Sequence, residues 1–172
     1  MAPHVSDDLT KWAAMAGYSL TPEDHSGAAL FWTDPGGAMR FYIRSPAKDS
    51  YIVSSAERAL PEQFDLFGTS MKVIERYLFG VFGSGVRSRR MLARLIIPTK
   101  QVQLAPGFSL DEPDAEGFRY LLDSNGLVAK ARGRVTSIST LTKLSHLLSS
   151  DLPDVQASYE DPEGRPLFAV RR

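Results

Sequence analysis

One stretch of the chain, residues 65–90, constrains the fold more than any other. From residue 71 onward, apolar side chains recur at steps of three and four, the spacing that places them on one face of a helix. Thr69 or Ser70 can accept hydrogen bonds from the first free backbone N–H groups and so begin this helix. We therefore predict a central helix whose apolar stripe must be covered by the rest of the chain. The stripe comprises Met71, Ile74, Leu78, Val81 and Phe82.

Glycines predict where this helix ends. Gly80, Gly83 and Gly85 interrupt the apolar pattern, and glycine inside a helix costs about 1 kcal/mol relative to alanine. We therefore expect the helix to stop there and a second helical piece to form at 86–93. Residues 94–97 then end that piece or form a short strand.

Most of the remaining chain has the pattern of antiparallel hairpins. Residues 28–33 and 38–44 flank the turn sequence Asp-Pro-Gly-Gly, and apolar and polar side chains alternate in the second run. A third strand is predicted at 51–54. Residues 118–122 and 127–132 flank an Asn-Gly pair, which is favoured in tight turns.

Two further helices are predicted from their N-caps. Ser6 can cap a short first helix that carries Trp12 and stops at Gly17. Ser137 or Ser139 can cap a later helix. The apolar positions of that later helix are Leu141, Leu144, Leu147 and Leu148.

The remaining segments are short. Residues 56–64 are predicted to form a loop or a one-turn helix leading into the central helix. Short strands are predicted at 101–104 and 108–110. Residues 155–159 and 167–170 are predicted to pair as a closing hairpin around a polar turn.

These elements predict the α+β fold class. We expect residues 1–172 to form a single domain in which a mostly antiparallel β-sheet of hairpins packs against several helices. The hydrophobic fraction of 43% and the charged fraction of 23% are ordinary globular values. The chain has no cysteine, which excludes disulfides, thiol nucleophiles and cysteine-based metal sites.

Charge and hydropathy argue against two classes of partner. Twenty basic and twenty acidic residues give a net charge of zero, so there is no general attraction to nucleic acid or to an anionic membrane. No apolar run approaches the roughly 18–20 residues of a membrane span. The first eight residues are acidic where a signal peptide would be basic. A cytoplasmic location is expected.

The chain shows no motif for chemistry. His25 follows Glu23 and Asp24, but no second histidine stands at a spacing that would complete a metal site. His146 lies among leucines on a predicted helix, where packing explains it better than catalysis. A Gly-x-Ser-x-Gly nucleophile motif is absent. We therefore predict no catalytic residues, no cofactor and no metal, and a protein that is not an enzyme.

The glycine–arginine region offers an alternative. Between Gly80 and Arg90, backbone N–H groups and the arginines could cradle an anion such as a phosphate. The glycine spacing matches neither the dinucleotide fingerprint nor the P-loop, and a helix stop explains the glycines more simply. A small-ligand or nucleotide-binding regulatory domain that uses the Gly80–Arg90 region is the alternative function.

Two segments carry opposite charge: 86–100 is basic and 111–123 is mostly acidic. They can be ordinary solvated faces that pair with each other, or one of them can steer a charged protein partner. The acidic segment lies between Phe108 and Phe118, which suits an interface with aromatic anchors inside a charged rim. The candidate partner-binding residues are Phe108, Asp111, Glu112, Asp114 and Glu116, with Asp161, Glu163 and Arg165 near the C-terminus as a second choice.

Three segments resemble bacterial immunity proteins. They are Gly-Tyr-Ser-Leu at 17–20, the Asp-Leu-Phe-Gly to Gly-Val-Arg-Ser-Arg stretch at 65–89, and the C-terminal segment at 158–168. The chain is similar to the antitoxin family of the tuberculosis necrotizing toxin from about Leu9 to Phe168. The resemblance implies a cytosolic antidote that binds a cognate secreted NAD-degrading toxin domain, one to one, and occludes its active site without chemistry or a cofactor of its own.

Overall fold

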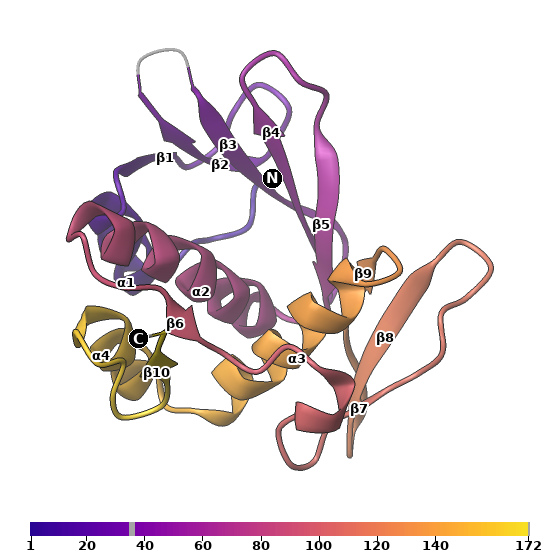
Figure 1. Cartoon of the computed structure of the whole chain (residues 1–172). Coiled ribbons are helices and arrows are strands. Elements are labelled where there is room, and N and C mark those ends of the chain that lie inside the picture. The colour runs from indigo at the N-terminus through magenta and orange to yellow at the C-terminus, as the bar shows by residue number, and fades with distance from the viewer. Residues whose placement is uncertain (35–36, 172) are drawn as a thin grey trace.

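The computed structural model describes residues 1–34 and 37–171 (Figure 1). Part of the predicted turn at 34–37 therefore lies outside the described residues. The helices are α1 (Asp7–Met15), α2 (Met71–Arg89), α3 (Thr136–Ser149) and α4 (Leu152–Glu160), with one 3-10 turn, η1 (Gln101–Gln103). The strands are β1 (Tyr18–Thr21), β2 (Ala29–Thr33), β3 (Met39–Ala47), β4 (Ser50–Glu57), β5 (Gln63–Gly68), β6 (Leu95–Ile96), β7 (Ser109–Leu110), β8 (Phe118–Asp123), β9 (Gly126–Arg132) and β10 (Ala169–Val170).

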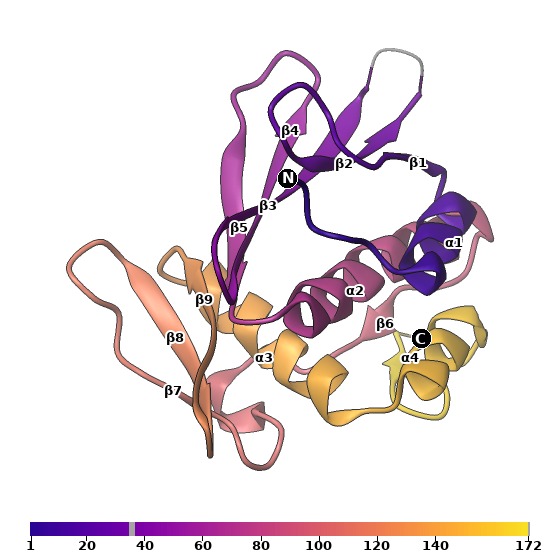
Figure 2. The same cartoon turned by 180° about the vertical axis from the view of Figure 1, so that it is seen from behind.

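The strands form a large antiparallel sheet and a small one. The large sheet has eight strands in the order β1-β2-β3-β4-β5-β9-β8-β7, and the small sheet pairs β10 with β6. The α+β prediction is confirmed. Strand β5 joins the β8–β9 hairpin through the pairs Phe67–Lys130 and Gly68–Ala129, and the ribbons of β5 and β8 diverge above this junction (Figures 1 and 2).

The hydrophobic core lies between one face of the large sheet and the helices. Alternate strand residues, among them Phe41, Ile43 and Leu66, point into it and are buried. Helices α1 and α2 cover the core side of the first strands, and α3 covers β8 and β9 (Figure 2). All four helices therefore belong to the core side of the sheet.

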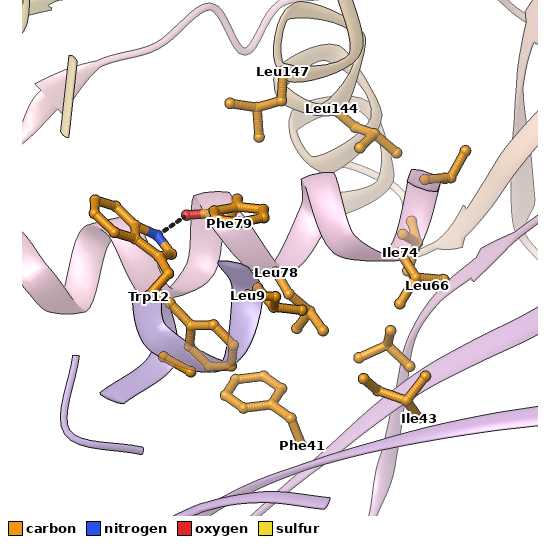
Figure 3. Packing of buried hydrophobic residues seen from close by; sticks show 14 of the residues in the cluster. Leu9, Trp12, Phe41, Ile43, Leu66, Ile74, Leu78, Phe79, Leu144 and Leu147 are labelled. Carbon is orange, nitrogen blue, oxygen red and sulfur yellow. Dashed lines mark hydrogen bonds between the residues drawn. The ribbon is translucent and has the colours of Figure 1, made fainter. Parts of the chain in front are cut away.

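Helix α2 is the central element, as predicted. The Ser70 hydroxyl accepts a hydrogen bond from the backbone N–H of Val73 and caps the helix. The helix contacts α1, α3, α4 and the sheet. Trp12 of α1 packs beside Phe79 and donates its indole N–H to the Phe79 carbonyl at 3.0 Å (Figure 3). The central helix is thus enclosed on several sides, because its apolar side chains pack against the three other helices and the sheet.

The predicted break in this helix is wrong: α2 runs without interruption from Met71 to Arg89. The glycines mark close helix packing. A Cβ atom added to Gly83 would lie 2.5 Å from a ring atom of Tyr159, and one added to Gly80 would lie 2.8 Å from Leu147. The glycines lower the intrinsic helix propensity, but they let α3 and α4 approach α2 closely.

Two strand predictions are wrong because local features favour helices. Residues 155–159 belong to α4, whose buried residues Val155, Ser158 and Tyr159 follow helical spacing. Pro153 stands at the start of that helix, where a missing N–H costs nothing. Consequently the closing hairpin does not form, and β10 pairs with β6 instead. Residues 101–103 form η1, because the Gln103 side chain accepts a hydrogen bond from the backbone of Lys100 at 3.2 Å.

The region at 56–64 was also predicted wrongly. Strand β4 extends to Glu57, and β5 begins at Gln63. A register shift between Val53 and Ser54 interrupts the pairing of β4 with β5. The side chains of β5 therefore do not alternate regularly between the two faces, and the sequence pattern does not predict the strand. The short strands predicted around 94–97 and 108–110 are present as β6 and β7.

The first and third helices test the cap predictions. Ser6 caps α1 as expected, accepting from the backbone N–H of Leu9 at 3.2 Å. Helix α3 instead begins at Thr136 without a side-chain cap, and the Ser137 hydroxyl donates to the Gly133 carbonyl. Neither serine proposed as the cap of α3 holds that position. None of the helices in the described part of the chain has the length and apolar character needed to cross a membrane.

Candidate functional site

The predicted acidic segment forms an exposed loop between β7 and β8. Asp111, Glu112 and Glu116 are exposed. Asp114 instead holds the loop together: its carboxylate accepts from the Tyr120 hydroxyl at 2.5 Å and from the backbone of Glu116 and Phe118. These hydrogen bonds, that from Tyr120 foremost, lower the pKa of Asp114. The loop is therefore a fixed turn that presents carboxylates outward.

The two aromatic residues beside this loop differ in their surroundings. Phe108 is half-buried and packs against the core. Phe118 faces away from the core and meets Phe64 edge to face, with ring centroids 5.4 Å apart. Of the two aromatic residues, Phe118 is therefore the one on the outer face of the sheet.

The second predicted set lies near the C-terminus, away from the acidic loop (Figures 1 and 2). Asp161 follows α4 and accepts hydrogen bonds from the backbone of Glu163 and Arg165 at 2.8 and 3.2 Å. The bond from Arg165 is the main cause of the lowered pKa of Asp161. Glu163 and Arg165 are exposed. The structure thus does not bring the two predicted sets into one patch.

The anion-binding interpretation of the Gly80–Arg90 region is wrong. Its glycines lie inside α2, so no glycine loop is available. Arg87 is 2% exposed, and Arg90 forms an ion pair with Glu160 at 3.0 Å. The Arg87 guanidinium donates to the backbone carbonyls of Ala93, Ser158, Tyr159, Asp161 and Pro162. This arginine holds the chain after α4 against the end of α2 and has no free face for a phosphate.

The described histidines belong to no group that could hold a metal ion. In the described residues, no group of three or more His, Cys, Asp or Glu side chains could hold a metal ion. His146 lies 2.7 Å from the Gln103 carbonyl through its Nε2 atom, which ties α3 to η1. A cavity of about 240 Å³ lies between α2 and α3 and is bordered by residues such as Tyr77, Val81 and Leu147. Its lining is mainly apolar.

The sequence analysis missed a group of side chains on the face of the sheet that points away from the helices. We call this group, contributed by β5, β8 and β9, the aromatic–basic cluster. Its members are Phe64, Phe67, Phe118, Lys130 and Arg132. Alternation along each strand places Phe67, Phe118, Lys130 and Arg132 opposite the core-facing Leu66, Leu121 and Ala129. Phe64 reaches the same outer face through the register shift between Val53 and Ser54, which leaves Asp65 as an extra residue in β5.

Cross-strand pairing fixes the geometry of the cluster. Lys130 pairs with Phe67 of β5, and Arg132 pairs with Phe118 of β8. The Lys130 ammonium lies 5.2 Å from the ring centre of Phe67 and 4.9 Å from that of Phe118. The Arg132 guanidinium lies 5.5 Å from the ring centre of Phe118. These distances are typical of cation–π interactions.

A surface hollow of about 310 Å³ borders the cluster at Phe64. Arg44 and Glu62 form an ion pair at its edge, and both interact with the Ser54 hydroxyl. Burial acts to raise the pKa of Glu62, but the hydrogen bonds from Arg44 and Ser54 outweigh it and lower that pKa. The hollow and the cluster form a continuous surface with apolar, cationic and hydrogen-bonding groups.

This arrangement defines a class of protein, an α+β scaffold whose outer sheet face carries an aromatic and basic group of side chains. The comparison with protein families identifies the family to which the chain belongs. A family model described as Immunity protein 61 matches residues 12–167, and the chain belongs to this family. It is an immunity protein, as the resemblance of the three sequence segments implied.

Individual relatives are similar to this chain over almost its whole length. An immunity factor for TNT from Mycobacterium tuberculosis is 32% identical over 170 residues, which cover 96% of this chain and 93% of the relative. A homologue of that factor from Mycobacterium bovis BCG has the same identity and coverage. The solved structure of Rv3902c from M. tuberculosis matches with a TM-score of 0.85 at 32% identity, covering 96% of this chain and 94% of that one.

Proposed function

We propose that this immunity protein neutralises a cognate secreted toxin domain by binding it one to one and occluding its active site. The observation that carries the proposal is the relationship to an immunity factor for TNT, which extends over 96% of this chain. A TM-score of 0.85 to a solved structure means that the scaffold is shared along with the sequence. Residues 1–172 act as one unit in this proposal.

The toxin domain in question degrades NAD and is secreted, as the resemblance to the necrotizing-toxin antitoxins implies. The immunity protein acts in the cytoplasm, before the toxin leaves, and performs no chemistry of its own. The relationship to an immunity factor for TNT supports this binding role.

The acidic loop remains a candidate contact. Asp111, Glu112 and Glu116 are exposed on a turn that Asp114 fixes, and a rigid loop loses little conformational entropy on binding. Asp161 has the same structural role in the C-terminal turn as Asp114 has in the loop. For both turns, the exposed residues are the candidate contacts and the two turn-fixing aspartates are supports.

The test is NAD hydrolysis by a necrotizing-toxin-type domain, titrated with this protein. Tight occlusion gives a linear fall in rate that ends near an equimolar ratio, because each immunity protein removes one toxin molecule. Isothermal titration calorimetry on the same pair checks the stoichiometry. A matched toxin that keeps its full rate at excess immunity protein would contradict the proposal.

A further inference from the structure

We propose that the aromatic–basic cluster is the face that docks the toxin domain, and that the docked toxin surface places carboxylates opposite Lys130 and Arg132. The inference rests on the proposed function and adds to it the contact face and the chemistry of the partner's surface. It differs from the sequence-based prediction, which put the contact on the acidic loop or the C-terminal turn.

The described part of the chain leaves this face of the sheet uncovered. Helices α1, α2 and α3 lie on the core side of the large sheet (Figures 1 and 2). Phe64, Phe67 and Phe118 occupy the opposite side and are partly exposed. Aromatic side chains in a central, partly exposed group are typical of the residues that contribute most of the binding energy at protein interfaces.

Contacts within the cluster already hold its side chains in place. Phe64 and Phe118 meet edge to face at 5.4 Å, and Lys130 is held over two rings. The strands beneath hold each side chain in register. A surface ordered in this way loses little side-chain entropy when a partner binds.

The two cations of the cluster offer charge complementarity to an acidic partner surface. Within the described residues, neither Lys130 nor Arg132 has a carboxylate within ion-pair distance; the ion pairs of the basic side chains involve Arg44, Arg90 and Arg165. Rings stabilise the two cations without neutralising them. A partner carboxylate placed here would gain a charge-assisted contact as water leaves the interface.

The acidic loop forms the border of the same surface. Arg132 Nε donates to the Glu116 carbonyl at 3.0 Å, and the Tyr120 hydroxyl donates to Asp114. The cationic centre and the anionic border are therefore joined through β8, which follows the acidic loop and pairs with β9. The partner that fits is a protein surface with carboxylates and apolar side chains at its centre and basic side chains at one edge. Such a pattern favours one orientation of docking.

The experiment compares two double charge reversals in the full chain. The test variant is Lys130→Glu with Arg132→Glu. The matched control is Lys11→Glu with Lys72→Glu, which makes the same change of charge at exposed positions of α1 and α2. The Kd for the toxin domain of the NAD titration is measured by calorimetry. We expect binding of the test variant to be weakened by about 100-fold and that of the control by less than about 3-fold.

Phe118→Ala and Lys130→Gln provide a second measurement. Each removes one contact without introducing a repulsive charge, and a thermal melt reports whether the variant is folded. We expect each folded variant to bind about 10-fold more weakly. If wild type binds the toxin and the folded variants bind as tightly, the docking face is wrong while the proposed function stands. If wild type does not bind the toxin, the proposed function fails, and this inference fails with it.

Discussion

Arg87 supplies the hydrogen-bond donors for carbonyl groups of two chain segments that meet at the end of α2. The guanidinium lies 2.7 Å from the Ala93 carbonyl and 2.7 Å from that of Asp161. Arg87→Ala removes the guanidinium donor from these carbonyls and from the buried carbonyls of Ser158 and Tyr159, and we expect it to lower the free energy of unfolding by about 3 kcal/mol. Urea denaturation followed by circular dichroism measures this change.

Two variants complete this first prediction. Arg87→Lys keeps the charge, but one ammonium group cannot donate to both chain segments. We therefore expect it to lower the free energy of unfolding nearly as much as Arg87→Ala does. Arg90→Ala removes a partly exposed ion pair with Glu160, which contributes less than about 1 kcal/mol. If the lysine variant is as stable as wild type, the positive charge, and not the planar guanidinium group, holds these two chain segments at the end of α2.

Asp65 gives a prediction for pH. Burial raises the pKa of this carboxyl, with a smaller opposing contribution from the Ser55 hydroxyl, and the Oδ2 atom is buried without a hydrogen-bond partner in the described residues. Between the unfolded and the raised folded pKa, the folded protein binds more protons than the unfolded chain. Stability contributed by this residue is therefore present at low pH and is lost as pH rises through that window.

The corresponding variant is Asp65→Asn, which removes the ionisation. We expect it to increase the free energy of unfolding at pH 7 by up to about 1 kcal/mol and to have little effect at pH 3, where the carboxyl of wild type is protonated in both states. Urea denaturation at the two pH values measures the difference. An equal change in the free energy of unfolding at both pH values would mean that the substitution acts through packing and not through the ionisation of Asp65.

At the scale of elements, the packing of α4 on α2 depends on Gly83. Its added Cβ atom would lie 2.5 to 2.7 Å from ring atoms of Tyr159, so Gly83→Ala forces the ring and α4 to move. We expect a net destabilisation of about 1 to 2 kcal/mol, because the overpacking cost exceeds the gain in helix propensity. Ser88→Ala, at an exposed site on the same helix, should change stability by less than about 0.5 kcal/mol. If Gly83→Ala stabilises the protein, the contact is looser than the geometry shows.

The same helix explains how far the elements could be predicted from sequence. Periodicity identified α2 because an apolar stripe is a local signal. It wrongly predicted that the helix ends at Gly83, because the residue that packs on this glycine, Tyr159, is 76 positions away in the chain. Residues 155–159 were mistaken for a strand because five residues are too few to separate the two periods. The hairpin at 118–132 was predicted correctly, since its turn sequence is specific.

At the scale of the whole molecule, the binding surface was harder to predict than the fold. The acidic loop was visible in the sequence because its charges are contiguous. The aromatic–basic cluster combines β5 with β8 and β9, which lie far from β5 in the chain and become its neighbours through the pairing of Phe67 with Lys130. Register decides which side chains share a face, and register between distant strands is not encoded in any single segment.

The arrangement of charge over the molecule predicts the kinetics of toxin binding. Since the net charge is zero, steering depends on local groups, whose fields extend about 8 Å at physiological salt. In the proposed docking geometry, Lys130 and Arg132 are central and Asp111 and Glu112 are at the rim. Central charges that lose their water act mainly on dissociation, whereas rim charges act on association.

We therefore expect Lys130→Glu with Arg132→Glu to raise the dissociation rate constant most, and Asp111→Lys with Glu112→Lys to lower the association rate constant by roughly threefold to tenfold. Surface plasmon resonance across a series from about 50 to about 500 mM NaCl measures both. The effect of the rim variant should fade as salt screens it, while that of the central variant should persist. The opposite result, with the dissociation effect at Asp111 and Glu112, would place the acidic loop at the centre of the interface and the aromatic–basic cluster at its edge.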